Sequence, residues 1–176
     1  WSEADYRGVA THRTNTYARQ ACYFLTEGDA PLSIPVESAE TTPLRDLDYT
    51  PAYAVYHPEE YSWYQSGRMF YESSSLAQTG TRTYQLPVVD PVSSAGGVLN
   101  IHFTAHSSSR VSVRVSVDGQ ERTSLSINSS GEYDAARAAT ASYTLASLQG
   151  GSTGTEVSLT VPAGVESRLG YLEMSY

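Results

Sequence analysis

The sequence contains no lysine, a single cysteine and no long apolar run. A transmembrane helix needs about 20 consecutive apolar residues, so we expect no membrane-spanning segment. One cysteine cannot form an internal disulfide, which leaves the redox compartment open. Cys22 lies in the apolar run 21–24, and nucleophilic catalysis would need a nearby base. We therefore expect Cys22 to be a small buried apolar residue.

Charged residues are also scarce, at 17% of the chain, and the net charge is −8. Nucleic-acid binding requires a basic face, so this balance argues against nucleic acid as a partner. Low charge, much serine, threonine and glycine, and fourteen tyrosines are typical of an extracytoplasmic β domain. The chain starts at Trp1 without a methionine, and we expect it to be a fragment of a longer protein.

Apolar and polar residues alternate almost without exception between residues 98 and 127. Period two in β-branched residues predicts antiparallel strands with one buried face and one solvated face. The same reasoning predicts the core residues, which are Ile101, Phe103, Val111, Val113, Val115, Leu159 and Val161.

Short strands punctuated by turns recur along the chain, without an internal repeat or a long amphipathic helix. Residues 28–66 are expected to be a largely irregular connection, because prolines recur there with little periodicity. The expected fold is a single all-β domain, residues 1–176, built as a two-sheet antiparallel sandwich of the jelly-roll type. The predicted strands cover 17–25, 53–57, 68–73, 82–89, 98–106, 110–118, 121–128, 139–146, 155–162 and 168–176.

Asp118-Gly119 predicts a β-hairpin. A two-residue loop would pair Val117 with Gln120 and turn Leu125 toward solvent, because directly paired residues share a face. One additional loop residue would instead pair Val113 with Leu125 on the core side. We therefore predict a three-residue loop, Asp118-Gly119-Gln120; the alternative is that strand 121–128 crosses to the other sheet.

The sequence predicts no catalytic residue, no metal site and no cofactor. His102 and His106 share one strand face about 13 Å apart, too far to bind one zinc ion, so we expect two solvated histidines. Acidic residues show no calcium-loop spacing. No Ser/His/Asp or paired-carboxylate motif is visible, which makes a stand-alone hydrolase improbable.

Aromatic residues are concentrated between residues 49 and 71. Exposed rings on a sandwich stack against sugar faces, but the same rings pack a long loop onto a sheet, and we favour packing. Arg68 and Glu72 are too far apart along a strand to pair directly. The candidate binding residues of this region are Tyr61, Trp63, Tyr64, Arg68 and Glu72.

Four segments in order resemble one family: YFLTEGD at 23–29, VYHPEEYSWYQSGRMFYES at 55–73, the strands from Leu86 to Gln120, and GYLEMSY at the end. They are similar to the N-terminal region of the PorU family, the gingipain-like sortases of type IX secretion in Bacteroidetes. The family motif reads SGRxWYGE. Here Phe70 replaces its Trp, and Glu72 stands one place early, where the family has Gly.

This resemblance implies a secreted or outer-membrane-surface protein, or a periplasmic one. It carries no active site to this chain, because the family's catalytic residues lie in a separate cysteine peptidase domain. The chain would then be a non-catalytic accessory domain, with the downstream peptidase domain in cis and secretion-system proteins as partners. The alternative function is a carbohydrate-binding module with a glycan as ligand, which exposed coplanar rings would favour.

Overall fold

The computed structural model describes residues 2–4, 10–12, 50–64, 69–92, 95–148 and 154–176. Its described part contains strands and no helix, so none there could span a membrane. The predicted strand 17–25 with Cys22, most of the connection 28–66, and Arg68 lie outside the described residues. The strands are β1 (Ser2–Ala4), β2 (Ala10–His12), β3 (Tyr53–Tyr56), β4 (Thr81–Leu86), β5 (Gly97–His106), β6 (Val111–Val117), β7 (Gln120–Ile127), β8 (Arg137–Leu145), β9 (Thr155–Thr160) and β10 (Glu166–Ser175).

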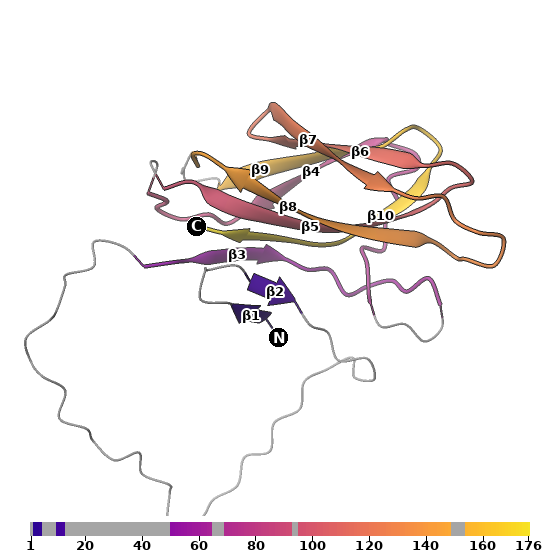
Figure 1. Cartoon of the computed structure of the whole chain (residues 1–176), viewed down its shortest axis with the longest axis horizontal. Coiled ribbons are helices and arrows are strands. Elements are labelled where there is room, and N and C mark those ends of the chain that lie inside the picture. Colours follow the sequence, from indigo (N-terminus) through magenta and orange to yellow (C-terminus); the bar gives the residue numbers. More distant parts are fainter. Residues whose placement is uncertain (1, 5–9, 13–49, 65–68, 93–94, 149–153) are drawn as a thin grey trace, which may run out of the picture.

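Eight of these strands form two stacked antiparallel sheets, with strand orders β3-β10-β5-β8 and β4-β9-β6-β7 (Figure 1). Successive strands alternate between the sheets except at the β6–β7 hairpin, which is a jelly-roll arrangement. β1 and β2 pair with each other as a separate two-stranded sheet. The predicted all-β sandwich is confirmed, and the eight predicted strands from 53–57 onward, except 68–73, match β3–β10 to within three residues.

The core lies between the two sheets, where alternate residues of each strand point inward. All seven predicted core residues are buried. Leu125, Ile127, Leu169, Leu172 and Met174 join them from β7 and β10. Period-two alternation therefore identified the inward face of the strands correctly.

β5 is buried on both faces, which contradicts the expectation of one solvated face. Its outward side chains Asn100, His102 and Thr104 are 5%, 9% and 1% exposed. The physical reason is that β5 lies between β10 and β8, and other parts of the chain cover its outer face. The alternation of polar and apolar residues along one strand cannot predict that a distant segment covers its polar face.

The predicted strand 68–73 is wrong for its described residues. Only one residue there forms a β-bridge, Tyr71 with Tyr61. The backbone then leaves this bridge, and Glu72 N–H donates to Leu169 O of β10 at 2.8 Å. The next such bond, from Leu76 N–H to Ser167 O at 3.0 Å, is four residues further on, so the chain follows the edge of β10 without forming a regular ladder.

The predicted three-residue hairpin loop is also wrong, although the core register is right. Val117 pairs with Gln120, and the loop is Asp118-Gly119 with φ values of 49° and 75°. Positive φ at both positions is the signature of a type I′ turn. The extra residue sits instead at Arg122, as a bulge in β7 opposite the Val115–Ser116 step. That bulge restores the predicted pairing of Val113 with Leu125.

Val113 tests whether the buried face is as tightly packed as its position indicates. Val113 is fully buried, whereas its neighbour Ser112 is exposed on the same strand. We expect Val113→Ala to lower the free energy of unfolding by about 1–3 kcal/mol through lost burial and a residual cavity. Ser112→Ala is the matched control and should change it little. Equal values for both variants in urea unfolding would contradict the assignment.

Candidate functional site

Residues 57–64 and 69–76 are here called the aromatic segment. Tyr71 lies on the outer face of the sheet β3-β10-β5-β8, and Glu72 and Leu76 then follow the edge of β10, where their N–H groups donate to Leu169 O and Ser167 O. Tyr61 and Tyr71 exchange two backbone hydrogen bonds of 2.8 Å, which hold the two arms together. Ser73 adds its N–H and its hydroxyl to Glu60 Oε2 at 3.0 and 2.6 Å, and these hydrogen bonds hold the pKa of Glu60 below its ordinary value. The aromatic segment is therefore cross-linked to itself before it contacts the sheet.

Arg168 of β10 holds the aromatic segment on the sheet. Its guanidinium carbon lies 3.7 Å from the centre of the Tyr61 ring and 5.5 Å from that of Trp63. Nη1 donates to the carbonyl of Glu72 at 3.2 Å and to that of Ser73. Nη2 donates to Glu166 Oε1 at 3.1 Å. Arg168 is 7% exposed, so the cation is held by ring faces, carbonyls and the Glu166 carboxylate rather than by water.

A column of stacked rings lies beside Arg168. His102 of β5 is placed between Tyr71 and Tyr171, with ring centres 5.8 and 5.3 Å apart and planes within 22° and 16°. Its Nδ1 lies 2.9 Å from Thr140 Oγ1 of β8. The expectation of two solvated histidines is therefore wrong for His102. His106 is exposed as expected.

Gly170 makes this column possible. A Cβ at position 170 would lie 2.3 Å from His102 Cδ2 and 3.2 Å from its carbonyl oxygen. The register between β10 and β5 also shifts at this point, between Leu169 and Tyr171. A glycine at the irregularity lets the imidazole lie flat against the backbone of β10.

Glu72 links the aromatic segment to the second sheet. Its Oε1 lies 2.6 Å from Nη1 of Arg82, and its Oε2 accepts a 2.9 Å hydrogen bond from the Tyr84 hydroxyl. Burial, and next the negative charge of Glu72, raise the pKa of Tyr84. All three groups are engaged with one another, so the predicted binding residue Glu72 is a structural anchor.

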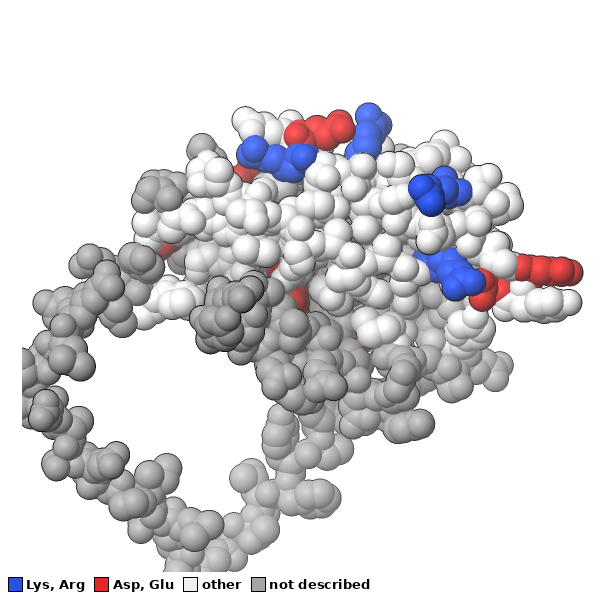
Figure 2. Space-filling view, viewed as in Figure 1, with Lys and Arg blue, Asp and Glu red and all other residues white. Residues whose placement is uncertain are grey.

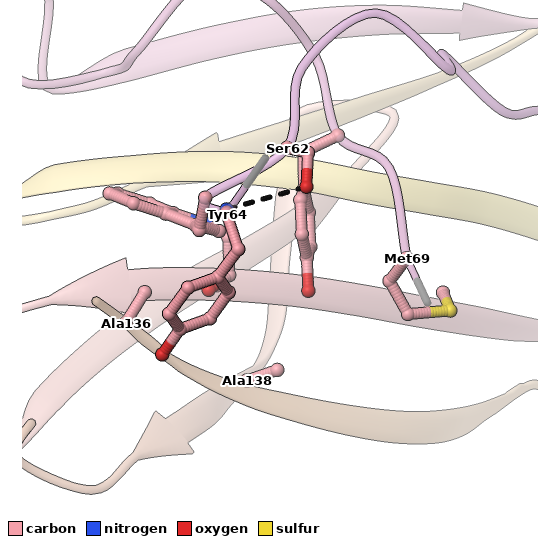
Figure 3. A pocket seen from close by; sticks show the side chains of 8 residues that line it. Ser62, Tyr64, Met69, Ala136 and Ala138 are labelled. Atoms are coloured by element: carbon pink, nitrogen blue, oxygen red, sulfur yellow. Dashed lines mark hydrogen bonds between the residues drawn. The ribbon is translucent and has the colours of Figure 1, made fainter. Parts of the chain in front are cut away.

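A cavity of about 190 Å³ opens between the aromatic segment and the start of β8 (Figure 3). We call it the aromatic pocket. Three rings and one thioether line its upper side, and the small residues of β5 and β8 line its floor. Tyr64 lies over β8 between Ala136 and Ala138, with Met69 at the far end (Figure 3). The lining residues are Ser62, Trp63, Tyr64, Met69, Tyr71, Thr104, Ala136 and Ala138.

The polar groups of this pocket are mostly occupied. Tyr64 Oη accepts a hydrogen bond from Ala135 N–H at 3.1 Å, and Ser62 Oγ accepts one from Tyr64 N–H at 3.4 Å. Thr104 Oγ1 donates to the Arg137 carbonyl at 2.9 Å. The indole N–H of Trp63 is different, because it is buried and has no acceptor among the described residues. The pocket therefore offers ring faces and the O–H donors of Ser62 and Tyr64, whose oxygens accept these hydrogen bonds.

The structure brings together three of the five predicted binding residues, since Tyr61 packs edge to face on Trp63 with ring centres 5.6 Å apart and Tyr64 is the neighbour of Trp63 in the pocket. Trp63 and Tyr64 line the aromatic pocket, whereas Tyr61 stacks on Arg168 and Glu72 pairs with Arg82. The predicted packing of the aromatic residues onto the sheet describes most of their contacts. Sequence reasoning missed Arg168 and the floor of the pocket. The four alanines at 135, 136, 138 and 139 were the available signal, because alanines at the start of an edge strand leave space beneath larger neighbours.

No cluster of three or more histidine, cysteine or acidic side chains that could hold a metal occurs in the described ranges. One acidic residue on the outer face is nevertheless buried. Glu173 of β10 is 2% exposed, and burial raises its pKa above the ordinary value. It lies across from Asn100 of β5 and Val55 of β3. This part of the sheet therefore carries a carboxyl group that is costly to ionise.

Arg168 should contribute strongly to stability. We expect Arg168→Met to lower the free energy of unfolding by at least about 2 kcal/mol, since two carbonyls lose their donor at about 1–3 kcal/mol each. Arg168→Lys should retain only part of the stability that Arg168→Met loses, because an ammonium group cannot reproduce the planar arrangement of donors in a guanidinium group. The control is Arg137→Met, whose side chain is 54% exposed. Chemical unfolding followed by near-ultraviolet circular dichroism measures all three, and equal losses for Arg168 and Arg137 variants would contradict the anchor.

Glu173 should make stability depend on pH. Because its pKa is higher in the folded than in the unfolded state, the native state binds more protons, and stability falls as pH rises from about 4.3 through the folded pKa. Glu173→Gln removes this dependence. The free energy of unfolding of the variant should therefore rise relative to that of the native protein as the pH increases from about 4 to about 7. Urea unfolding across that range tests it, with the exposed Glu121→Gln as control. A difference that does not change with pH would refute the assignment.

Comparison with known proteins identifies a related fold. No family model and no curated protein matches the chain. The dimeric latent PorU from Porphyromonas gingivalis is similar in structure with a TM-score of 0.56 and 23% identity, over 73% of this chain and 13% of the PorU chain. This chain therefore spans about an eighth of PorU, and the similarity shows a shared fold.

Two carbohydrate-binding modules are also similar, with lower scores. The CBM36-1 domain of a xylanase from the hindgut metagenome of Trinervitermes trinervoides has a TM-score of 0.33 and 14% identity, over 53% of this chain and 67% of that module. A family 35 module from Clostridium thermocellum has a TM-score of 0.38 and 14% identity, over 72% of this chain and 98% of that module. At these scores the modules support no conclusion about this chain.

Proposed function

We propose that this chain is a non-catalytic accessory domain of a larger PorU-like protein at the outer-membrane surface or in the periplasm. Its role is to bind the downstream cysteine peptidase domain of the same chain, or proteins of the secretion system. The observation that carries the proposal is the fold shared with PorU over 73% of this chain. The ordered motif segments around Ser66-Gly67-Arg68 and the final strand support it independently.

The chemistry of the aromatic segment favours recognition over catalysis. Arg168, Glu72 and Arg82 hold one another or backbone groups in fixed geometry. Toward solvent the segment presents the Tyr64 ring, which is 55% exposed beside the half-buried Trp63, together with the exposed Glu59, Glu60, Ser73 and Ser74. An exposed aromatic ring within a polar surround is typical of binding surfaces. We therefore assign partner binding to the aromatic segment.

Carbohydrate binding is the second candidate, and the aromatic pocket is the observation that favours it. Its volume of about 190 Å³ and its Trp63 and Tyr64 rings would accept a single sugar ring. Sugar recognition also needs several unused hydrogen-bonding groups around the ligand. The described pocket offers the O–H donors of Ser62 and Tyr64, whereas Thr104 is engaged with the Arg137 carbonyl, and no carboxylate or amide side chain is among its lining residues. Protein binding therefore ranks first.

Two measurements test the accessory role. The parent gene should encode a cysteine peptidase domain downstream of Tyr176. The 176-residue chain should then bind that separately produced domain in isothermal titration calorimetry, and show no peptide cleavage of its own. Trp63→Ala should weaken binding roughly tenfold, as for a central interface aromatic, whereas the exposed Ser124→Ala should not.

The competing function gives a different pattern. A chain that ignores the peptidase domain but binds members of a printed oligosaccharide array, with binding lost in Trp63→Ala, is a carbohydrate-binding module. A parent gene with no peptidase domain would also overturn the accessory role.

A further inference from the structure

β8 is an edge strand that lacks the usual protection of edges. It pairs with β5 on one side, and no strand of the described residues pairs with its other side. Natural edge strands carry prolines, bulges, inward charges or a short length that discourage pairing. β8 is nine residues long, RAATASYTL, has no proline, and pairs with β5 without a register shift. Its outward side chains at 138, 140, 142 and 144 are all exposed.

A hollow lies beside each face of β8 at the same register. The aromatic pocket has Ala136 and Ala138 in its floor. A second cavity, of about 380 Å³, is called here the polar hollow. It is lined by Ser126, Asn128, Ser129, Arg137, Ala138 and Ala139. The alanines of residues 135–139 create both spaces, because they remove side-chain volume on either face of the strand.

We propose that β8 binds an extended peptide segment by strand addition, with one large apolar side chain in the aromatic pocket and a neighbouring acidic side chain in the polar hollow. Successive side chains of a strand point to opposite faces, so two hollows at one register match two adjacent residues. Main-chain hydrogen bonds supply affinity in this mode, and alternate pockets supply specificity. This inference rests on the proposed role in partner binding and names the kind of segment bound.

The chemistry of each hollow selects its occupant. Met69, Tyr71 and the two alanines give the aromatic pocket an apolar lining, which suits one large apolar side chain. Arg137 is the charged side chain among those that line the polar hollow.

Arg137 gives the charge complementarity. It is 54% exposed and contacts Asp134 Oδ2 through one nitrogen at 2.5 Å. A guanidinium has five N–H donors, so Arg137 can donate hydrogen bonds to a second carboxylate as well as to Asp134. Figure 2 shows basic side chains over β7 and near the start of β8, with acidic side chains beside them in both places and a largely uncharged surface between. The preference for an acidic side chain therefore rests on Arg137, the charged residue of the polar hollow.

The test uses the 176-residue chain, labelled with ¹⁵N, and a defined probe. The probe is the blocked octapeptide acetyl-Thr-Val-Thr-Phe-Glu-Thr-Val-Thr-amide. The largest amide shifts should fall on residues 136–140 of β8. Replacing Phe by Ala, or Glu by Lys, in the peptide should weaken binding roughly tenfold. N-methylation of alternate peptide amides should abolish it, because strand addition needs those hydrogen bonds.

Variants of the chain separate the edge from the rest of the surface. Ala138→Phe fills the aromatic pocket from an exposed position, so it should leave the melting temperature unchanged and weaken peptide binding at least roughly tenfold. Arg137→Ala should weaken the Glu peptide and not its Lys counterpart. Thr144→Ala, at the far end of β8 on the same face, is the control and should have no effect.

Several outcomes overturn the proposal. In the peptide experiments they are amide shifts located away from β8, equal affinity for the N-methylated peptide, or unchanged peptide affinity of the Ala138→Phe variant. A sugar that occupies the pocket in place of the peptide, or dimerisation of the chain through β8 detected by light scattering, would also overturn it. If the octapeptide does not bind while the Ala138→Phe variant still binds the peptidase domain with normal affinity, strand addition is wrong and the accessory role stands. If the chain also ignores the peptidase domain, both are wrong.

Discussion

The burial of the Arg168 cation is the constraint on which the rest of the outer face depends. A guanidinium removed from water must be satisfied by acceptors and ring faces, or the fold loses several kcal/mol. Here the Tyr61 ring and the carbonyls of Glu72 and Ser73 supply those contacts, together with the Glu166 carboxylate of β10. All of these groups except Glu166 belong to the aromatic segment. The segment therefore cannot leave the sheet without exposing its own carbonyls and releasing the cation.

The jelly roll places this cation where one segment can reach both sheets. β10 lies between β3 and β5, and among the described residues β3 pairs with 172–175 of β10, so the edge near Arg168 is open to the aromatic segment. From there Glu72 reaches Arg82 of the second sheet, and Tyr71 stacks on His102 of the first. Three separate contacts thus fix the rings that form the aromatic pocket, which makes it a rigid surface beside the free edge of β8.

The sequence predicted the parts of the fold that local pattern controls. Alternation located the strands and inward residues such as Val113, and burial predicted its pairing with Leu125. The hairpin loop was mispredicted because a type I′ turn followed by a bulge at Arg122 gives the same core register as a longer loop. His102 was mispredicted because Tyr71 and Tyr171, far away along the chain, cover it.

Only part of the site was visible from the sequence for the same reason. Aromatic density identified Trp63 and Tyr64, but nothing near Arg168 in the chain indicates that it lies beneath Tyr61. The most direct test of this account is an NMR measurement on the Arg168 guanidinium of the native protein. The account predicts separate, slowly exchanging Nη protons shifted upfield by the Tyr61 ring. A single averaged signal at the position of a solvated arginine would contradict it.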